Sequence, residues 1–400
     1  MRVNYGQTVH GQAEIDAVVA VLRGSTQMGD KVRAMQQQVA QLFDKRHGIM
    51  VNSGSSANFL AVALLDLPPG AEVITPALTF ATTVAPLVQH GLVPVFADAA
   101  AGTYNLDADL VEPLIGPQTR ALMVPSLIGN LPDWPRLRAL ADRHDLRLIE
   151  DSADTLGATV DGVSTGRYSD MSTTSFYGSH VINGAGNGGM LCVSDDALAR
   201  RALLLRSWGR SSSLFVDSET IENRFNVDLD GIAYDAKFLF EELGYNLEPS
   251  EIGAAFGLVQ LDSLRRNIAA REANFAAHLE FFAGYEHWFE LPRQWPGSVT
   301  GWLAFPLTLR AEAPFSRRDL QIWLERRDIQ TRPVFTGNIL RQPAMRNVTL
   351  RRDPRGYPVA DAVMRGGILL ACHHGLEPEQ IDYMHDCFLE FAHLVSRKAV

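Results

Sequence analysis

Two polar side chains follow strand-like runs in the sequence, and both could do chemistry. Asp151 follows the strand-like run 145–150, and His180 lies in a glycine-rich loop after the run 173–175. A carboxylate at the carboxyl end of a parallel strand lies where open α/β sheets bind ligands. An imidazole carries protons near neutral pH but has no primary amine for a Schiff base. We therefore predict a ligand at Asp151 and proton transfer at His180, although each residue alone would also suit a helix cap or a packing role.

A turn of small residues forms a candidate phosphate site earlier in the chain. The strand-like run 47–52 leads into Gly54, Ser55 and Ser56 and then into a helix-like segment. Gly54 lets the backbone approach a ligand closely, and the N–H groups of Ser55 and Ser56 would point toward an anion at the helix start. Such a turn is often only a helix cap, so it indicates a phosphate site only together with the later residues.

The order of these stretches resembles the DegT/DnrJ/EryC1/StrS family of sugar aminotransferases. In that family a turn like 53–57 grips the phosphate of pyridoxal phosphate (PLP), and a pair like Ser175 and Phe176 precedes by four residues a lysine that binds PLP covalently. This chain has His180 at the lysine position. The substitution resembles the branch that removes the 3-hydroxyl group from nucleotide-linked 4-keto-6-deoxy sugars. The resemblance implies an α/β fold of the PLP-dependent aspartate aminotransferase type (fold type I).

The resemblance also implies roles for individual residues. Asp151 would pair with the pyridine nitrogen of the cofactor, and Phe80 would stack on its ring, although from the sequence alone Phe80 reads as a core residue. Asn246 lies in a segment that crosses to the partner subunit in the family, so it implies a homodimer with shared active sites. The implied cofactor-binding residues are Gly54, Ser55, Ser56, Phe80, Asp151, Asp154, Ser175 and Asn246, the catalytic residue is His180, and the tentative substrate contacts are Arg206 and Arg332.

Lysine and cysteine positions narrow the cofactor chemistry that the resemblance implies. Lysine occurs only at Lys31, Lys45, Lys237 and Lys398, so we predict a non-covalent cofactor, held as pyridoxamine phosphate (PMP). His180 would then move protons while the hydroxyl group leaves. An iron-sulfur cluster normally needs four thiolates, and the chain has 3 dispersed cysteines. We therefore expect no iron-sulfur cluster, and L-glutamate as the co-substrate that regenerates PMP.

Two other readings stay open. An ordinary nucleotide 4-keto-sugar aminotransferase would use Lys237 as its PLP lysine. A catalytically silent family member would bind PMP or a sugar nucleotide without turnover. The nucleotide of the substrate, which could be GDP, CDP or dTDP, and the identity of the hexose also stay open.

The elements that must position these residues alternate between strand-like and helix-like segments. This predicts a mostly parallel mixed sheet with helices on both faces in a large cofactor-binding domain, residues 1–250, with an N-terminal helical segment and a helix around 107–113. A single linking helix is expected over 251–282, and a smaller C-terminal α+β domain over 283–400. The polar insertion 211–234 would suit a specificity loop or a surface excursion.

Composition and charge exclude several classes of protein. The 400 residues carry 46 acidic and 36 basic side chains, so the net charge is -10, and the lack of a long basic run argues against a nucleic-acid partner. No apolar run approaches a membrane span or a signal-peptide core, so we expect a cytoplasmic protein. We expect no metal site, because adjacent His373 and His374 on a strand would point to opposite faces.

Overall fold

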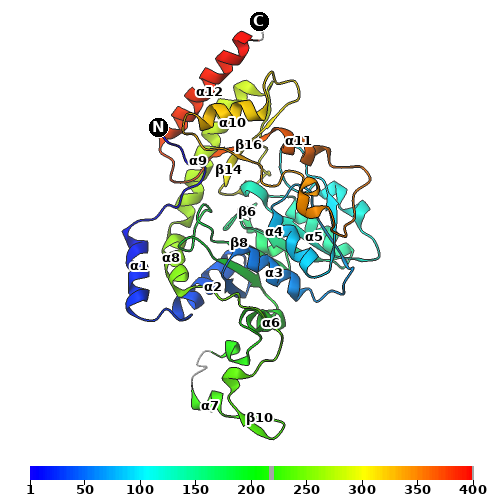
Figure 1. The fold of residues 1–400 in the computed structure, drawn as a ribbon, viewed down its shortest axis with the longest axis vertical. Helices are drawn as coiled ribbons and strands as arrows, with labels where there is room; N and C mark the ends of the chain where they lie inside the picture. The colour runs from blue at the N-terminus through cyan, green and yellow to red at the C-terminus, as the bar shows by residue number, and fades with distance from the viewer. Residues whose placement is uncertain (216–219, 399–400) are drawn as a thin grey trace.

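A computed structural model describes residues 1–215 and 220–398 of the chain, and a seven-stranded sheet forms its centre (Figure 1). The strands follow the order β1-β9-β8-β5-β4-β2-β3. Five of them, from β8 to β3, pair in parallel, and β9 runs antiparallel to both neighbours. The predicted mostly parallel mixed sheet is therefore confirmed. The strands are β1 (His47–Val51), β2 (Glu72–Pro76), β3 (Val93–Ala97), β4 (Thr119–Pro125), β5 (Arg147–Asp151), β8 (Met171–Ser175) and β9 (Gly189–Val193).

Helices cover both faces of this sheet because its strands are apolar on both sides. In β1, Ile49 and Val51 pack toward the cluster that contains α3 and α6, while Met50 packs toward α2 on the opposite face. Alternate residues of a strand point to opposite faces, so a strand that is buried on both sides needs a continuous apolar run. The helices of this part are α1 (Gln12–Arg23), α2 (Asp30–Leu42), α3 (Gly54–Leu64), α4 (Ala81–Gln89), α5 (Trp134–Arg143) and α6 (Asp196–Arg206).

The C-terminal part contains a second sheet, of four strands, in the order β12-β14-β16-β15. A cluster of aromatic rings, including Phe282, Phe305 and Phe388, packs this sheet against long helices. The division of the chain at residues 250 and 282 stays a prediction. The elements are α8 (Glu251–Asp262), α9 (Leu264–Phe282), β12 (Phe289–Glu290), β14 (Ala304–Leu309), α10 (Arg317–Glu325), β15 (Arg332–Pro333), α11 (Pro358–Gly366), β16 (Gly367–Ala371) and α12 (Pro378–Lys398), and a small three-stranded sheet comprises β6 (Thr159–Val160), β7 (Val163–Ser164) and β13 (Ser298–Val299).

Two expected helices differ in the structure. The single helix over 251–282 is interrupted at Ser263, which ends α8 and begins α9. At this point the Ser263 N–H donates to the Gln260 and Leu261 carbonyls, which closes the last turn of α8, and the Ser263 hydroxyl accepts from the Arg266 side chain at 3.0 Å. The helix expected around 107–113 is instead two short 3₁₀ turns, the second of which contains Pro113, a residue without the N–H that a longer helix needs.

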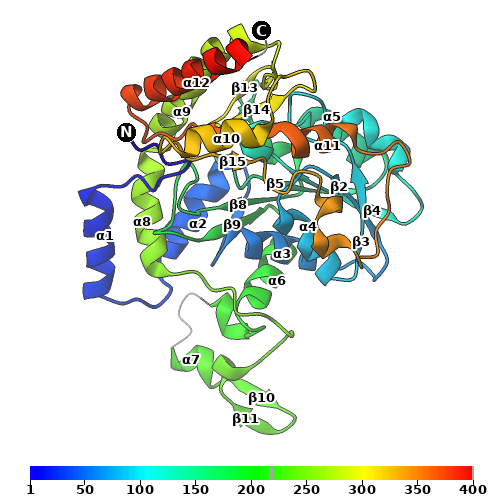
Figure 2. The same ribbon diagram turned by 45° about the horizontal axis from the view of Figure 1, so that its top comes forward.

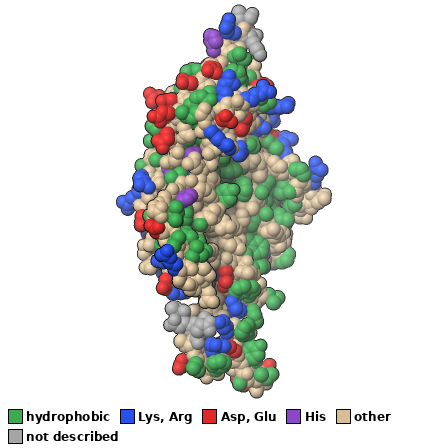
Figure 3. All heavy atoms as spheres, turned by 60° about the vertical axis from the view of Figure 1, so that its left-hand side comes forward, with side chains coloured by type: hydrophobic (Ala, Val, Ile, Leu, Met, Phe, Trp, Pro, Cys, Tyr) green, Lys and Arg blue, Asp and Glu red, His purple; other side chains and the backbone are tan. Residues whose placement is uncertain are grey.

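The segment 210–243, which we call the arm, extends away from the rest of the molecule (Figures 1 and 2). It contains the whole predicted insertion 211–234, of which residues 216–219 lie outside the described part. Its elements are α7 (Ile221–Arg224), β10 (Val227–Leu229) and β11 (Ile232–Tyr234). The arm exposes many large apolar side chains, some of which are visible on the lower projection in Figure 3: Phe215, Ile221, Phe225, Leu229, Ile232, Tyr234, Phe238, Phe240 and Leu243.

The N-terminal segment joins the two parts of the molecule. The Val3 N–H donates to the Asp328 carbonyl, and the Gln330 N–H donates to the Val3 carbonyl. Further on, α1 lies along α8 (Figures 1 and 2). Among the described residues, no helix is both long enough and apolar enough to cross a membrane.

Candidate active site

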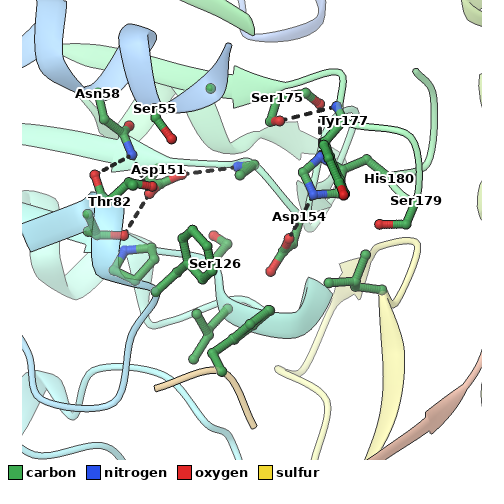
Figure 4. Close-up of a pocket in the computed structure, with 18 of the residues that line it drawn as sticks. Ser55, Asn58, Thr82, Ser126, Asp151, Asp154, Ser175, Tyr177, Ser179 and His180 are labelled. Atoms are coloured by element: carbon green, nitrogen blue, oxygen red, sulfur yellow. Dashed lines mark hydrogen bonds and ion pairs between the residues drawn. The ribbon is translucent and has the colours of Figure 1, made fainter. Parts of the chain in front are cut away.

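A cavity of about 570 Å³ lies where β4, β5 and β8 end (Figure 4). Carboxyl ends of parallel strands meet at one edge of a sheet, so residues that are distant in the sequence converge here. The chain therefore brings its candidate chemical groups together by topology. The predicted site residues that line the cavity are Gly54, Ser55, Phe80, Asp151, Asp154, Ser175, His180 and Arg332.

Asp151 is buried at the end of β5, and both of its carboxylate oxygens accept hydrogen bonds. Asn58 Nδ2 and Thr83 Oγ1 donate to Oδ2 at 2.8 and 2.9 Å. The Ala153 N–H donates to Oδ1 at 3.2 Å. Burial raises the pKa of the Asp151 carboxyl, and these donors oppose the shift because they stabilise the charged form. A buried carboxylate held in this way is suited to pair with a cationic group of a ligand.

The His180 ring is held with one nitrogen available to the cavity. Its Nδ1 lies 3.1 Å from the backbone carbonyl oxygen of Ser175, which can only accept a hydrogen bond. Nδ1 therefore carries the proton, and Nε2 has the free lone pair in the neutral ring. Burial lowers the pKa of His180 to about 4, so the ring is neutral at pH 7 and can act as a base.

Asp154 lies beside this available nitrogen. Its Oδ1 is 3.6 Å from His180 Nε2, and its Oδ2 accepts the Ile128 N–H at 2.9 Å. Burial, together with the smaller effect of the negative charge of Asp151, raises the pKa of Asp154 to about 7. Near neutral pH the carboxyl thus changes its protonation state next to a neutral imidazole. This pair is suited to receive and release a proton.

The turn before α3 forms an anion site. Ser53 caps the helix, since its Oγ accepts the Ser56 N–H at 3.1 Å. The N–H groups of Gly54 and Ser55 have no partner within the helix and lie at the cavity. A Cβ at Gly54 would lie 2.5 Å from Ser175 Cβ, so only glycine lets α3 begin this close to β8. A phosphate group fits such a helix start.

The remaining lining residues suit an aromatic ring with polar substituents. Phe80 lies edge-on to Phe335, with ring centroids 5.7 Å apart, and is 48% exposed. The prediction of a core position for Phe80 is therefore wrong. The Ser126 hydroxyl is buried at the cavity without a hydrogen-bond partner in the described structure, and a ligand atom could satisfy it. The anion site, the carboxylate, the aromatic face and the hydroxyl together fit PLP or PMP.

Three predicted site residues do not line the cavity. The Ser56 hydroxyl instead donates to Asn52 Oδ1 at 2.6 Å. Asn246 is exposed and pairs with Ser207 through a backbone bridge. Arg206 is buried, and its guanidinium donates to Gln36 Oε1 and to the Met50 carbonyl. In this structure Arg206 therefore stabilises the fold, and it does not reach the cavity as the predicted substrate contact would.

Sequence reasoning missed several cavity residues. Asn58 follows Ser55 by three positions, so helical spacing alone would have placed it on the same face of α3. Tyr5 lines the cavity from the N-terminal segment. The Cζ atom of Arg332 lies 5.5 Å from the centroid of the Tyr5 ring. Burial raises the pKa of Tyr5, and no local signal predicts its position.

Lysine and cysteine side chains lie away from the cavity lining. In the described part of the chain, no lysine lines the cavity, and Lys237 belongs to the arm. Cys192, Cys372 and Cys387 are buried on separate elements. Within residues 1–215 and 220–398, no group of three His, Cys, Asp or Glu side chains could hold a metal ion.

Comparison of the sequence with known proteins identifies a family and similar enzymes. The model of the DegT/DnrJ/EryC1/StrS aminotransferase family matches residues 9–389. A dTDP-4-dehydro-2,6-dideoxy-D-glucose 3-dehydratase of Saccharopolyspora spinosa is 35% identical over 404 residues, which cover 96% of this chain and 85% of the relative. Over a shorter stretch of 182 residues, a UDP-N-acetyl-3-dehydro-alpha-D-glucosamine 3-aminotransferase of Acidithiobacillus ferrooxidans is 37% identical, covering 46% of this chain and 49% of that protein.

Solved structures show the same fold over nearly the whole chain. GDP-4-keto-6-deoxy-D-mannose 3-dehydratase of Escherichia coli with bound hydrated PLP has a TM-score of 0.87 and 26% identity, covering 97% of this chain and all of that one. A structure of GDP-4-keto-6-deoxymannose 3-dehydratase with a trapped PLP-glutamate geminal diamine has the same TM-score and identity, covering 96% of this chain and all of that one. The aminotransferase-like PLP fold that the sequence predicted is confirmed.

Proposed function

Because the chain belongs to the DegT/DnrJ/EryC1/StrS aminotransferase family, we propose that it removes the C3 hydroxyl group from a nucleotide-linked 4-keto-6-deoxyhexose. The observation that carries the proposal is His180, which presents Nε2 to the cavity where no described lysine lies. The names of the similar 3-dehydratases support the same reaction. The chain is then a PLP- or PMP-dependent sugar 3-dehydratase.

The cofactor is held without a covalent bond in this proposal. The N–H groups of Gly54 and Ser55 and the hydroxyl of Ser175 hold its phosphate. Phe80 contacts its ring, and the Asp151 carboxylate pairs with the ring nitrogen, where it stabilises positive charge. When bound as PMP, the cofactor supplies a primary amine for the C4 ketone and a ring that accepts electrons.

His180 moves the proton that the elimination requires. Its Nε2 accepts a proton, and the ionised Asp154 carboxylate, 3.6 Å away, stabilises the resulting imidazolium. The hydroxyl group at C3 leaves as water after it receives a proton, and His180 is placed to donate that proton. The fixed Nδ1 hydrogen bond keeps the same nitrogen facing the cavity throughout.

The substrate and co-substrate are a nucleotide sugar and L-glutamate. Arg332 is exposed at the cavity, so its guanidinium is available for a phosphate or carboxylate group. The trapped PLP-glutamate complex of a similar 3-dehydratase supports glutamate as the amine source. An enzyme that regenerates PMP in this way needs no iron-sulfur cluster.

A second copy of the chain completes each site. Asn246 lies outside the cavity of its own chain and is exposed, as a residue that contacts a partner's cofactor would be. The adjoining arm exposes Phe238, Phe240 and Leu243, and apolar surface of this kind is typical of contact with another protein. We therefore propose a homodimer with shared active sites.

A turnover assay tests the proposed function. The purified protein is incubated with PLP, L-glutamate and, separately, the GDP-, CDP- and dTDP-linked 4-keto-6-deoxyhexoses, and mass spectrometry detects loss of water. We expect dehydration with at least one nucleotide and its loss in His180→Asn. An active His180→Asn protein would place the proton carrier elsewhere, and a wild type without turnover would favour a silent family member.

An aminotransferase is the second candidate, since the family description and one relative name that activity. It would use Lys237, which lies in the arm. Borohydride would then trap PLP on Lys237, and the product would carry an amine instead of losing a hydroxyl group. If Lys237→Met keeps full dehydratase activity and borohydride traps no PLP, this candidate is excluded.

A further inference from the structure

The guanidinium of Arg271 is fully buried between the His180 loop (residues 176–188) and the C-terminal part of the chain. Arg271 lies on α9, and its side chain is 0% exposed. One terminal nitrogen, Nη2, donates to the backbone carbonyls of Ser179 and His180, both at 3.0 Å. The other, Nη1, donates to the Trp302 carbonyl at 3.0 Å.

These contacts fix the backbone that carries His180. Two consecutive carbonyls accept from one nitrogen, while the ring of the same histidine is tied to the Ser175 carbonyl through Nδ1. The planar fork of an arginine can hold several acceptors at once in a defined geometry. The backbone position of His180 is therefore held from outside the loop by a side chain on α9, while the Ser175 carbonyl orients the ring.

The third donor group of Arg271, its Nε–H, also has a neutral partner, so no counterion among the described residues contacts the guanidinium. Its Nε donates to His374 Nδ1 at 3.1 Å, so His374 must be neutral there. In the described part of the chain, none of the Arg271 hydrogen bonds goes to a carboxylate. Burying a charge without a paired partner costs several kcal/mol, so a purely packing role would be better filled by an apolar side chain.

The positive charge of Arg271 also acts on the imidazole. Burial is the main cause of the lowered pKa of His180, and the charge of Arg271 lowers that pKa further. The other titratable groups at this end of the cavity are Asp154 after β5, Tyr177 on the loop itself and Tyr5 from the N-terminal segment. Among the groups that shift the pKa of His180, Arg271 is the one that carries a positive charge.

We propose that Arg271 is a positioning residue for the proton carrier: its guanidinium fixes the His180 loop through the Ser179 and His180 carbonyls, and its positive charge adds to the burial that disfavours an imidazolium. The catalytic role of this positioning rests on the proposed function. The geometric and electrostatic claims concern residues of this chain alone and are testable without turnover.

Two substitutions separate geometry from charge. Arg271→Lys keeps the charge but loses the fork, so kcat should fall about 100-fold, as expected when a reacting group is misplaced by about 1 Å, while the acid limb of the pH–rate profile stays in place. Arg271→Gln loses both, so kcat should fall and the acid limb should move about one unit to higher pH, because removing the positive charge raises the pKa values of both His180 and Asp154. In both variants KM for the sugar nucleotide should stay within about twofold, because Arg271 touches no substrate.

Arg265→Gln is the matched control, since Arg265 is an exposed arginine of the same helix. It removes the same charge and should leave kcat and the pH profile unchanged. Unaltered kcat in Arg271→Lys would overturn the proposal, and this test remains if Arg271→Gln fails to fold.

An NMR titration keeps the inference distinguishable from the proposed function. In protein labelled at its histidine rings, with His180→Asn to assign the signal, the His180 resonance should titrate at higher pH in Arg271→Gln than in wild type. A wild type without dehydratase activity would defeat the proposed function but leave this shift measurable. An unchanged His180 titration in Arg271→Gln would overturn the electrostatic part of the inference.

Discussion

At the scale of single residues, burial raises the pKa of the Asp151 carboxyl, and hydrogen bonds from its neighbours oppose that shift. Asn58 and Thr83 come from two different helices and donate to the same oxygen. The sequence predicted the position of Asp151 because strand ends mark the ligand edge of a parallel sheet, but it did not predict these two donors. The predicted roles of the cavity residues stay proposals.

Asp151→Asn should keep the fold and lose about 100-fold or more in activity. An amide oxygen still accepts from Asn58 and Thr83, but a neutral group cannot stabilise a positive charge on the cofactor ring. Steady-state kinetics and thermal unfolding measure the two effects separately. Near wild-type turnover in Asp151→Asn would remove Asp151 from the ring nitrogen.

Gly54→Ala should weaken cofactor binding about tenfold, because its Cβ would lie 2.5 Å from Ser175 Cβ and would push the start of α3 away from β8. The absorbance of PLP or PMP during titration measures the affinity. Gly284→Ala is the control, since nothing lies within 4 Å of a Cβ there. Equal affinities in the two variants would contradict the anion site at this turn.

The residues near His180 that sequence analysis missed are distant from it in the sequence and reach it only in the folded chain. Tyr5 and Arg271 reach the His180 loop only after the N-terminal segment and α9 have packed against it. Neither residue has a motif around it, and each would be read as an ordinary surface or core position. Ser56 was predicted to bind the cofactor; in the structure its hydroxyl donates to Asn52 Oδ1, and its role toward a cofactor stays a prediction.

At the scale of elements, the alternation of strands and helices was predictable because its periods differ clearly. The errors lie where local chemistry overrides the pattern, as at Ser263 and Pro113. Contacts between elements were not predictable, and one of them is a histidine pair that joins α9 to α12. His278 Nε2 donates to the Ala371 carbonyl at 3.0 Å, and its Nδ1 accepts from His385 Nε2 at 3.0 Å.

This pair should make the protein acid-labile. Burial lowers the pKa of His278 to about 3, below the ordinary value of 6.5. Between these two values His278 is protonated in the unfolded state but neutral in the folded state, so lower pH favours unfolding. The contribution is fully present above pH 6.5 and is lost as the pH falls toward 3. His278→Gln keeps a donor and an acceptor but does not titrate, so its free energy of unfolding should depend less on pH, by about 1.4 kcal/mol per pH unit below pH 6.

Urea unfolding at several pH values between about 4.5 and 7 measures this difference. This range covers about two pH units below the unfolded-state pKa of histidine, where the effect of His278 should develop. His393→Gln provides the control, because His393 is an exposed histidine of α12. Identical pH dependence in wild type and His278→Gln would show that His278 does not limit acid stability.

At the scale of the whole molecule, the exposed arm and the exposed Asn246 are the features on which the proposed homodimer rests. Composition predicted a polar insertion, but the structure shows that this segment exposes many apolar side chains (Figure 3). The difference has a physical cause: charged and apolar residues are mixed along the segment, and only the folded arm shows that many of its apolar side chains are exposed among the described residues.

Hybrid dimers test the shared site. His180→Asn and Asn246→Ala should each be nearly inactive alone. After the two proteins are unfolded and refolded together, about half of the dimers are hybrids with one intact site of two, so about a quarter of wild-type activity should return. Sedimentation checks the assembly state, and an active monomer would contradict the proposed homodimer.

The pairing of β1 with β9 sets the time at which a newly made chain can first hold its cofactor. β1 precedes the turn at Ser53, yet its partner β9 begins only at Gly189, where a Cβ would lie 2.3 Å from the Ser53 carbonyl oxygen. On a ribosome, a nascent chain that ends before β9 thus lacks the strand against which the phosphate turn is packed. In the proposed site, the cofactor therefore binds only after β9 has formed, and its binding to the folded form stabilises complete chains against unfolding.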